Sequence, residues 1–130
     1  MSGNDLLNQL TVNGRYKLRF ELQLRNLSWY WAEYSSFIVL SEAHNYRMRV
    51  SGYSGNVGDA LRYHNNRMFT TYDRDNDPRT GNCASLVGGG FWYSSCSHCR
   101  VNGAGDNFQW YQATINKWHD RQTSHMWLTC

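Results

Sequence analysis

The sequence predicts an α+β fold in which an antiparallel sheet forms the core, short helices accompany it, and the second half is rich in loops. The chain has 130 residues, which suits one domain, and 41% of them are hydrophobic, enough for a packed core. Apolar and polar residues alternate between residues 16 and 24. The eleven glycines lie mostly after residue 51, beside a single proline, Pro78, which is typical of tight turns rather than long helices.

The first half of the chain predicts the sheet. Asp5–Leu10 is expected to be irregular or to form one short helical turn. In Tyr16–Leu24 the period of two places one face on a core and the other in water. A second, aromatic-rich run covers Trp29–Val39, and Tyr46–Val50 alternates again. Three successive strands of this kind indicate an antiparallel sheet.

The amino-acid composition changes after the third expected strand. Residues 52–59 have the composition of turns, and Asp59 is expected to cap a short helix through Ala60 and Leu61. Residues 73–106 are dominated by Gly, Asn, Asp, Ser and Cys. A region so poor in regular structure is usually functional, or is held by covalent or metal links. We therefore expect a sheet subdomain over about 1–70 and a ligand-binding subdomain over about 71–130.

Charge and hydropathy exclude two classes of partner. The net charge is +3, and the arginines are scattered without a basic stripe, so nucleic acid is not an expected partner. No apolar run of about 18 residues is present to span a membrane. The first residues lack the pattern of a signal peptide, so a secreted protein would contain this sequence as an internal or processed piece. The aromatic content of 15% favours specific contact surfaces.

An acidic turn is the first candidate site. Asp73, Asp75 and Asp77 stand at alternate positions and would repel one another unless a cation lay among them. Hard oxygen ligands at this spacing suit Ca²⁺, whereas the alternative is a solvated acidic turn. The segment is not an EF-hand loop, because Pro78 replaces the turn glycine and Ala84 replaces the bidentate glutamate.

The four cysteines leave three interpretations open. Disulfides fit an extracellular chain, and four cysteines allow three pairings. A redox pair at Cys96 and Cys99 lacks the expected βαβ context. A zinc site lacks a second paired knuckle, and its candidate ligands are Cys96, His98, Cys99, His119, His125 and Cys130. The even count and the loop-rich setting favour disulfides, with Cys83 as the fourth cysteine.

Several ordered motifs resemble the fibrinogen-related family. In chain order they are residues 34–37 (YSSF), 46–61 (YRMRVSGYSGNVGDAL), 69–77 (FTTYDRDND), 81–84 (GNCA), 89–93 (GGFWY) and 102–103 (NG). The resemblance covers most of residues 5–128 and is weakest after Tyr111. It is to the C-terminal part of a domain of roughly 200 residues or more. It therefore implies that a missing N-terminal subdomain, a homo-oligomer or a partner covers exposed faces.

The resemblance implies a metal site and a crosslink. The calcium ligands would be the carboxylates of Asp75 and Asp77 and the main-chain carbonyls of Arg79 and Gly81, with Asp73 beside them. The family disulfide would join Cys83 to Cys96, and a cis peptide would precede the second cysteine, between Ser95 and Cys96. Two cysteines lie outside the usual family positions and would pair with each other or with a partner chain: Cys99 and Cys130.

The resemblance also implies a pocket for acetylated ligands beside the calcium loop. The lining expected in this chain is Val87, Trp92, Tyr93, Ser97, His98, Phe108 and Thr114. Ser97 stands where the family has a histidine, although His98 is adjacent. Val87 and Thr114 replace aromatic, acidic or basic wall residues, and the loop before Phe108 is short. Altered specificity or loss of the sugar site follows from these departures.

The resemblance implies a secreted, calcium-dependent recognition module, lectin-like and acting in innate immunity. The alternative is a structural or adhesive module that binds matrix or a receptor and has no working sugar pocket. An enzyme is not expected, because no third group orients the neighbouring Cys96 and His98. By pattern, Asn26 is an acceptor for N-glycosylation.

Overall fold

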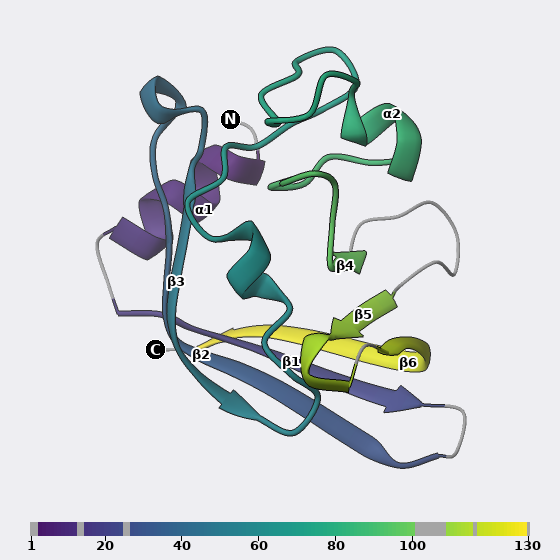
Figure 1. Ribbon diagram of the computed structural model, residues 1–130. Coiled ribbons are helices and arrows are strands. Elements are labelled where there is room, and N and C mark those ends of the chain that lie inside the picture. The colour runs from purple at the N-terminus through teal and green to yellow at the C-terminus, as the bar shows by residue number, and fades with distance from the viewer. Residues whose placement is uncertain (1–2, 13–14, 25–26, 101–108, 116, 130) are drawn as a thin grey trace.

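The computed structural model describes residues 3–12, 15–24, 27–100, 109–115 and 117–129 (Figure 1). Its helices and strands, in chain order, are α1 (Gly3–Val12), β1 (Lys17–Leu24), β2 (Trp29–Val39), η1 (Glu42–His44), β3 (Met48–Gly55), η2 (Leu61–His64), α2 (Cys83–Val87), β4 (Cys99–Arg100), β5 (Gln109–Gln112), η3 (Ala113–Ile115) and β6 (Lys117–Thr129). The elements labelled η are single turns of 3₁₀-helix. The α+β class is confirmed.

One antiparallel sheet holds the strands in the order β3-β2-β1-β6-β5-β4. The three predicted strands are confirmed as β1, β2 and β3, but β3 continues to Gly55, so the turn expected from residue 52 begins later than predicted. Sequence reasoning missed β5 and β6, although β6 pairs along the whole of β1, with Phe20 opposite Met126. The sheet therefore extends across the subdomain boundary expected near residue 70.

The N-terminal segment forms a ten-residue helix, α1, so the expectation of an irregular stretch or a single turn was wrong. The helix is fixed against β2 by two polar side chains. Asn8 Nδ2 donates to the Val39 carbonyl at 2.8 Å, and the Val39 amide donates to Thr11 Oγ1 at 2.9 Å. Thr11 is only 1% exposed. Tertiary contacts therefore complete a helix whose own sequence signal is weak.

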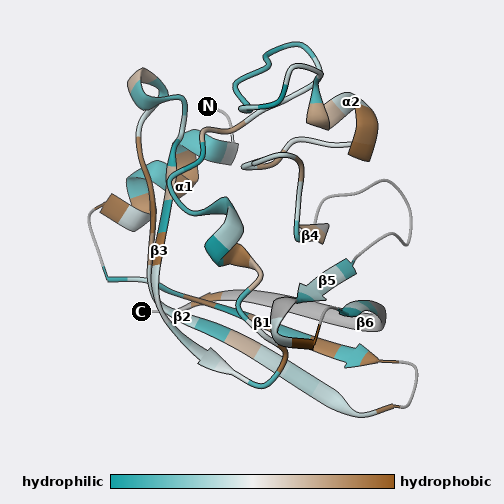
Figure 2. Cartoon of the chain, in the orientation of Figure 1, coloured by the Kyte–Doolittle hydropathy of each residue, from teal (hydrophilic) through white to brown (hydrophobic). Residues whose placement is uncertain are grey.

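Inward-facing residues of the sheet build the core. Leu18, Phe20 and Leu22 alternate with more exposed residues in β1, and Leu22 is fully buried. Trp110 of β5 is also fully buried and packs on Phe20, with ring centroids 5.1 Å apart. The loop before α2 is mostly hydrophilic and lies away from the sheet (Figure 2).

The loop-rich segment is attached to the sheet by buried polar groups. The Tyr34 hydroxyl donates to Asp59 Oδ1 at 2.7 Å and accepts from the Leu61 amide at 3.2 Å. Burial, with the Asp59 carboxylate beside it, raises the pKa of Tyr34. Asp59 also accepts from the Arg62 amide, 3.1 Å away, although the N-cap residue of the short helix is Ala60 and not Asp59 as predicted. That helix is the 3₁₀ turn η2.

Candidate functional site

The acidic turn is ordered by its own carboxylates. Asp75 Oδ1 accepts from the Asp77 amide at 3.2 Å, and Asp77 Oδ1 accepts from the Arg79 amide at 2.9 Å. Asp73 Oδ1 instead accepts from the Thr71 hydroxyl at 2.6 Å. Because these short-range bonds bend the chain sharply, Asp75 and Asp77 stand in the same turn while Asp73 is bonded at its start.

The turn is connected to a disulfide. Asp77 Oδ2 accepts from the amide of Cys83 at 2.9 Å, and Arg79 Nη1 lies 3.4 Å from Cys96 Sγ. The Cys83–Cys96 disulfide is present, with a sequence separation of 13. The Ser95–Cys96 peptide bond is cis. Both features match what the family resemblance implied, and they make the acidic turn and the crosslinked loop one connected unit.

The donor chemistry of this turn fits a calcium ion. Two carboxylates lie in one turn, and no hydrogen bond among the described residues ends on the main-chain oxygens of Arg79 or Gly81. Carboxylate and carbonyl oxygens are the ligands that Ca²⁺ accepts together. Within the described part of the chain, no group of three or more His, Cys, Asp and Glu side chains could hold a metal. A cation at the turn would therefore depend on backbone oxygens as well as on Asp75 and Asp77.

Asn82 fixes the end of the turn and the start of α2. Its Oδ1 accepts from the amide of Ala84 at 2.9 Å, and its Nδ2 donates to the carbonyl of Tyr72 at 2.9 Å. One side chain thus caps the helix and closes the loop behind it. This places Cys83 at the first residue of α2, where its sulfur is completely buried.

A buried histidine, His64, bonds to the backbone on both sides of Cys96. His64 is 0% exposed; its Nδ1 lies 2.8 Å from the Trp92 carbonyl, and its Nε2 accepts from the His98 amide at 3.0 Å. The carbonyl requires the proton on Nδ1, and the amide requires a lone pair on Nε2, so the ring is neutral. Burial lowers the pKa of His64 to about 4, helped by the nearby His98 and Arg67.

Four aromatic rings continue from this histidine across the surface; we call Tyr63, His98, Tyr111 and Trp118 the aromatic row. The Tyr63 and His98 rings stack with centroids 3.7 Å apart and 11° between their planes. His98 contacts Tyr111 at 4.7 Å, and Tyr111 contacts Trp118 at 5.2 Å. The row rests on backbone pairing, because Tyr111 and Trp118 are directly opposed in β5 and β6. Burial lowers the pKa of His98, which favours its neutral ring.

A shallow pocket of about 400 Å³ borders one end of the row, and we call it the Asp59–His98 pocket. Its lining residues are Asp59, Arg62, Tyr63, Asn65, Arg67, Ser94 and His98. The Tyr63 hydroxyl donates to the Ser95 carbonyl at 3.0 Å, beside the cis peptide. The pocket therefore combines stacked ring surface with carboxylate, guanidinium, amide and hydroxyl groups, the mixture that orients a polar ligand.

The predicted pocket residues do not all meet in one place. Trp92 and Tyr93 are 8% and 2% exposed, and their polar atoms donate to the carbonyls of Tyr46 and Gly89. They are packed in the interior and do not line the Asp59–His98 pocket. Three other predicted residues are distributed as follows: Val87 is half-buried at the end of α2, Ser97 is half-buried beside His98, and Thr114 is exposed in η3.

Other predictions fall partly or wholly outside the described residues, namely those on Asn26, Phe108 and Cys130. Cys99 carries a free thiol that is 1% exposed, so the Cys99–Cys130 disulfide is not part of this structure. Burial raises the pKa of the Cys99 thiol, which makes it an inert buried group rather than a nucleophile.

Sequence reasoning missed most of the Asp59–His98 pocket and of the aromatic row. Tyr63 precedes His64 in a 3₁₀ turn and carries no periodic signal. The closely spaced aromatic segments around Tyr111 and Trp118 were the available signal, since a β5–β6 pairing places them side by side. Recognising that pairing in advance would have found half of the row.

The geometry is that of a sheet that carries a crosslinked, polar loop segment. A family model described as the fibrinogen beta and gamma chains, C-terminal globular domain, matches residues 1–129. The chain belongs to this family, whose members are non-enzymatic recognition and structural domains, so the expectation that it is not an enzyme is confirmed.

Among curated relatives, human ficolin-3 is 42% identical over 102 residues, covering 78% of this chain and 34% of the relative. Mouse tenascin is 43% identical over 106 residues, covering 81% and 5%. Mouse angiopoietin-related protein 7 is 44% identical over 102 residues, covering 78% and 30%. The chain thus spans about a third or less of these proteins.

Solved structures agree with this assignment. The fibrinogen-like globe domain of human ANGPTL6 superposes with a TM-score of 0.84 at 32% identity, covering 97% of this chain and 61% of that one. A lamprey fibrin D-dimer, complexed with the peptide Gly-His-Arg-Pro-amide, gives a TM-score of 0.82 at 28% identity, covering 97% and 48%. In the described part of this chain, no helix combines the length and the apolar character needed to cross a membrane.

Proposed function

We propose that this chain is part of a secreted, calcium-ordered recognition module that binds carbohydrate or other acetylated ligands in innate immunity. The observation that carries the proposal is the Tyr63–His98 stack at the edge of the Asp59–His98 pocket. Aromatic faces pack against the C–H face of a sugar ring or an acetyl methyl group, while a few fixed polar groups orient its hydroxyls. The relative ficolin-3 and the family match support recognition as the general role.

Calcium would act through the hydrogen bond and the disulfide that connect the turn to the pocket. Asp77 bonds the Cys83 amide, Cys83 is crosslinked to Cys96, and His98 follows two residues later. An ion held by Asp75, Asp77 and the carbonyls of Arg79 and Gly81 would keep this chain of contacts ordered before a ligand arrives. Preordering lowers the conformational entropy lost on binding.

Calcium binding is tested by thermal unfolding with added Ca²⁺ and with excess chelator. We expect Ca²⁺ to raise Tm in the unchanged chain and to have no effect on Asp77→Asn. Asp73→Asn is the matched control, because Asp73 bonds to the Thr71 hydroxyl rather than within the turn. An unchanged Tm in chelator would remove the metal from the proposal.

Ligand binding is tested on an array of acetylated and non-acetylated glycans, with and without chelator. His98→Ala removes the stacking partner of Tyr63 and should weaken binding at least tenfold. Tyr72→Ala is the matched control, since Tyr72 is 78% exposed and does not line the pocket. Equal loss in both variants, or binding by neither the variants nor the unchanged chain, would contradict the sugar-binding proposal.

A second candidate function is adhesion to a protein partner through the aromatic row. It is favoured by Trp118, which is 40% exposed at the far end of the row, and by the burial of Trp92 and Tyr93. Tenascin and angiopoietin-related proteins are among the relatives, and the lamprey structure carries a peptide ligand. Binding of Gly-His-Arg-Pro-amide that is lost in Trp118→Ala and kept in Trp29→Ala, without any glycan signal, would favour this function. Trp29 is 48% exposed and lies outside the row.

A further inference from the structure

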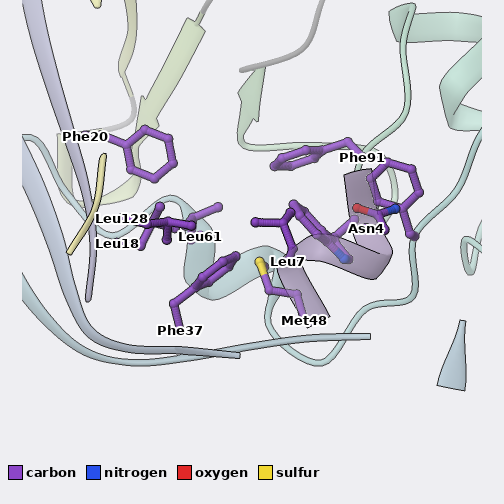
Figure 3. Close-up of a pocket in the computed structure, with 11 residues that line it drawn as sticks. Asn4, Leu7, Leu18, Phe20, Phe37, Met48, Leu61, Phe91 and Leu128 are labelled. Carbon is purple, nitrogen blue, oxygen red and sulfur yellow. The ribbon is translucent and has the colours of Figure 1, made fainter. Parts of the chain in front are cut away.

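A cavity of about 150 Å³ lies between the sheet, α1 and the aromatic segment around Phe91 (Figure 3). In Figure 3 the labelled side chains surround an open central space. Its lining comes from several elements and is apolar except for Asn4: Asn4, Leu7, Leu18, Phe20, Phe37, Met48, Leu61, Phe69, Phe91, Trp92 and Leu128. The indole N–H of Trp92 is already used, because it donates to the Tyr46 carbonyl at 2.7 Å.

The solvent exposure of the lining residues shows which part of the cavity is deep and which part opens toward solvent. Deep residues such as Leu18, Phe20 and Leu61 are at most 4% exposed. Four lining residues are only half-buried and mark where the cavity approaches solvent: Asn4, Leu7, Phe69 and Leu128. A small molecule could therefore enter between α1 and the end of β6 without unfolding the sheet.

The lining selects the chemistry of an occupant. A buried water needs two to four polar partners, and Asn4 supplies the single polar side chain, so water is held poorly. A charged guest would lose its hydration without a partner charge. Apolar cavities of roughly 150 Å³ with aliphatic and aromatic walls remain dry and take up benzene or xenon.

We propose that this cavity is a binding site for one small, uncharged, apolar molecule of about the size of benzene. An aromatic ring suits the walls well, because Phe69 and Phe91 already meet Trp92 edge to face, with centroids 5.2 and 5.5 Å apart. The Asn4 amide at the mouth permits one neutral polar substituent, such as a hydroxyl. The cavity shares no lining residue with the Asp59–His98 pocket, so it is a separate site.

The first test titrates fluorobenzene into the unchanged chain and follows it by fluorine NMR. We expect saturable binding to one site. Fluorobenzoate carries the same ring with a negative charge, and we expect it to bind at least tenfold more weakly. Absence of saturable fluorobenzene binding, or equal binding of the charged ring, would overturn the proposal.

The second test places a larger side chain at the solvent-facing end of the cavity. Leu7→Phe adds a ring at a lining position of α1 and should weaken fluorobenzene binding at least tenfold. Leu10→Phe makes the same change on the same helix at a residue that is 39% exposed and outside the lining, and it should bind as before. Equal binding by a folded Leu7→Phe chain would contradict the assigned location. If Leu7→Phe does not fold, the comparison of fluorobenzene with fluorobenzoate decides by itself.

Discussion

The sheet and the crosslinked loop segment, residues 65–98, hold their shape in different ways. In the sheet, β1 pairs along its length with both β2 and β6, so its order is distributed over many equivalent backbone bonds. In the loop segment, backbone amides end on individual side chains, such as Asp77, Asn82 and His64, and a disulfide closes the loop. The order of the loop segment therefore depends on a few specific groups, each of which can be removed separately.

The largest expected effect is in the sheet core. Leu22→Ala removes a fully buried side chain and should lower the free energy of unfolding by about 3–4 kcal/mol, measured by urea denaturation. Leu86→Ala is the control, because Leu86 is 62% exposed on α2, and it should change stability by less than about 0.5 kcal/mol. Similar losses in both variants would erase the contrast between core and loop.

The second largest loss of stability is expected when the Cys83–Cys96 disulfide is removed. Replacing Cys83 and Cys96 together by Ala opens a loop of sequence separation 13 and should cost about 3 kcal/mol through the freed unfolded chain. The same measurement after reduction of the unchanged chain should show a similar loss. Reductant should have no further effect on the double variant, and a reduced chain as stable as the oxidised one would contradict the role given to the crosslink.

The pH dependence of stability tests how much the loop segment depends on a single side chain, that of His64. Burial lowers the pKa of His64 to about 4 in the folded chain, whereas the unfolded value is near 6.5. The neutral ring therefore contributes fully to the free energy of unfolding above pH 6.5, and this contribution is lost as the pH falls toward 4. This linkage predicts a loss of about 2 kcal/mol by pH 5. His64→Gln, which can donate and accept without titrating, should flatten that slope. His44→Gln, at an exposed position, should keep it; a slope that persists in His64→Gln would contradict the assignment.

The smallest effect is expected on the solvent side of the sheet. Arg19 pairs with Glu21 at 2.8 Å and Glu33 at 3.5 Å, and its guanidinium lies 4.6 Å from the centre of the Trp31 ring. These side chains are about a third exposed, so Arg19→Gln should cost only about 0.5 kcal/mol, less at high salt. A loss that exceeds that of the disulfide variant would show that the sheet also depends on single polar groups.

The sequence alone determined the parts of the molecule in which neighbours along the chain decide the structure. The alternation through Leu18, Phe20 and Leu22 predicts β1 because the burial of a strand follows a period of two. The resemblance to the fibrinogen-related family, carried by ordered motifs, implied the Cys83–Cys96 pair, and the structure contains this disulfide. The alternating aspartates indicated an acidic turn, and in the structure the carboxylates of this turn bond to nearby backbone amides.

Only the tertiary structure decided the features that depend on distant partners. β6 is long but lacks simple alternation; it is held by pairing with β1, about a hundred residues earlier in the chain. The same pairing carries β5 and thereby brings Tyr111 and Trp118 into line with Tyr63 and His98. Side chains from separate segments share a surface only after the sheet has formed, so local sequence patterns record neither the complete aromatic row nor the cavity under α1.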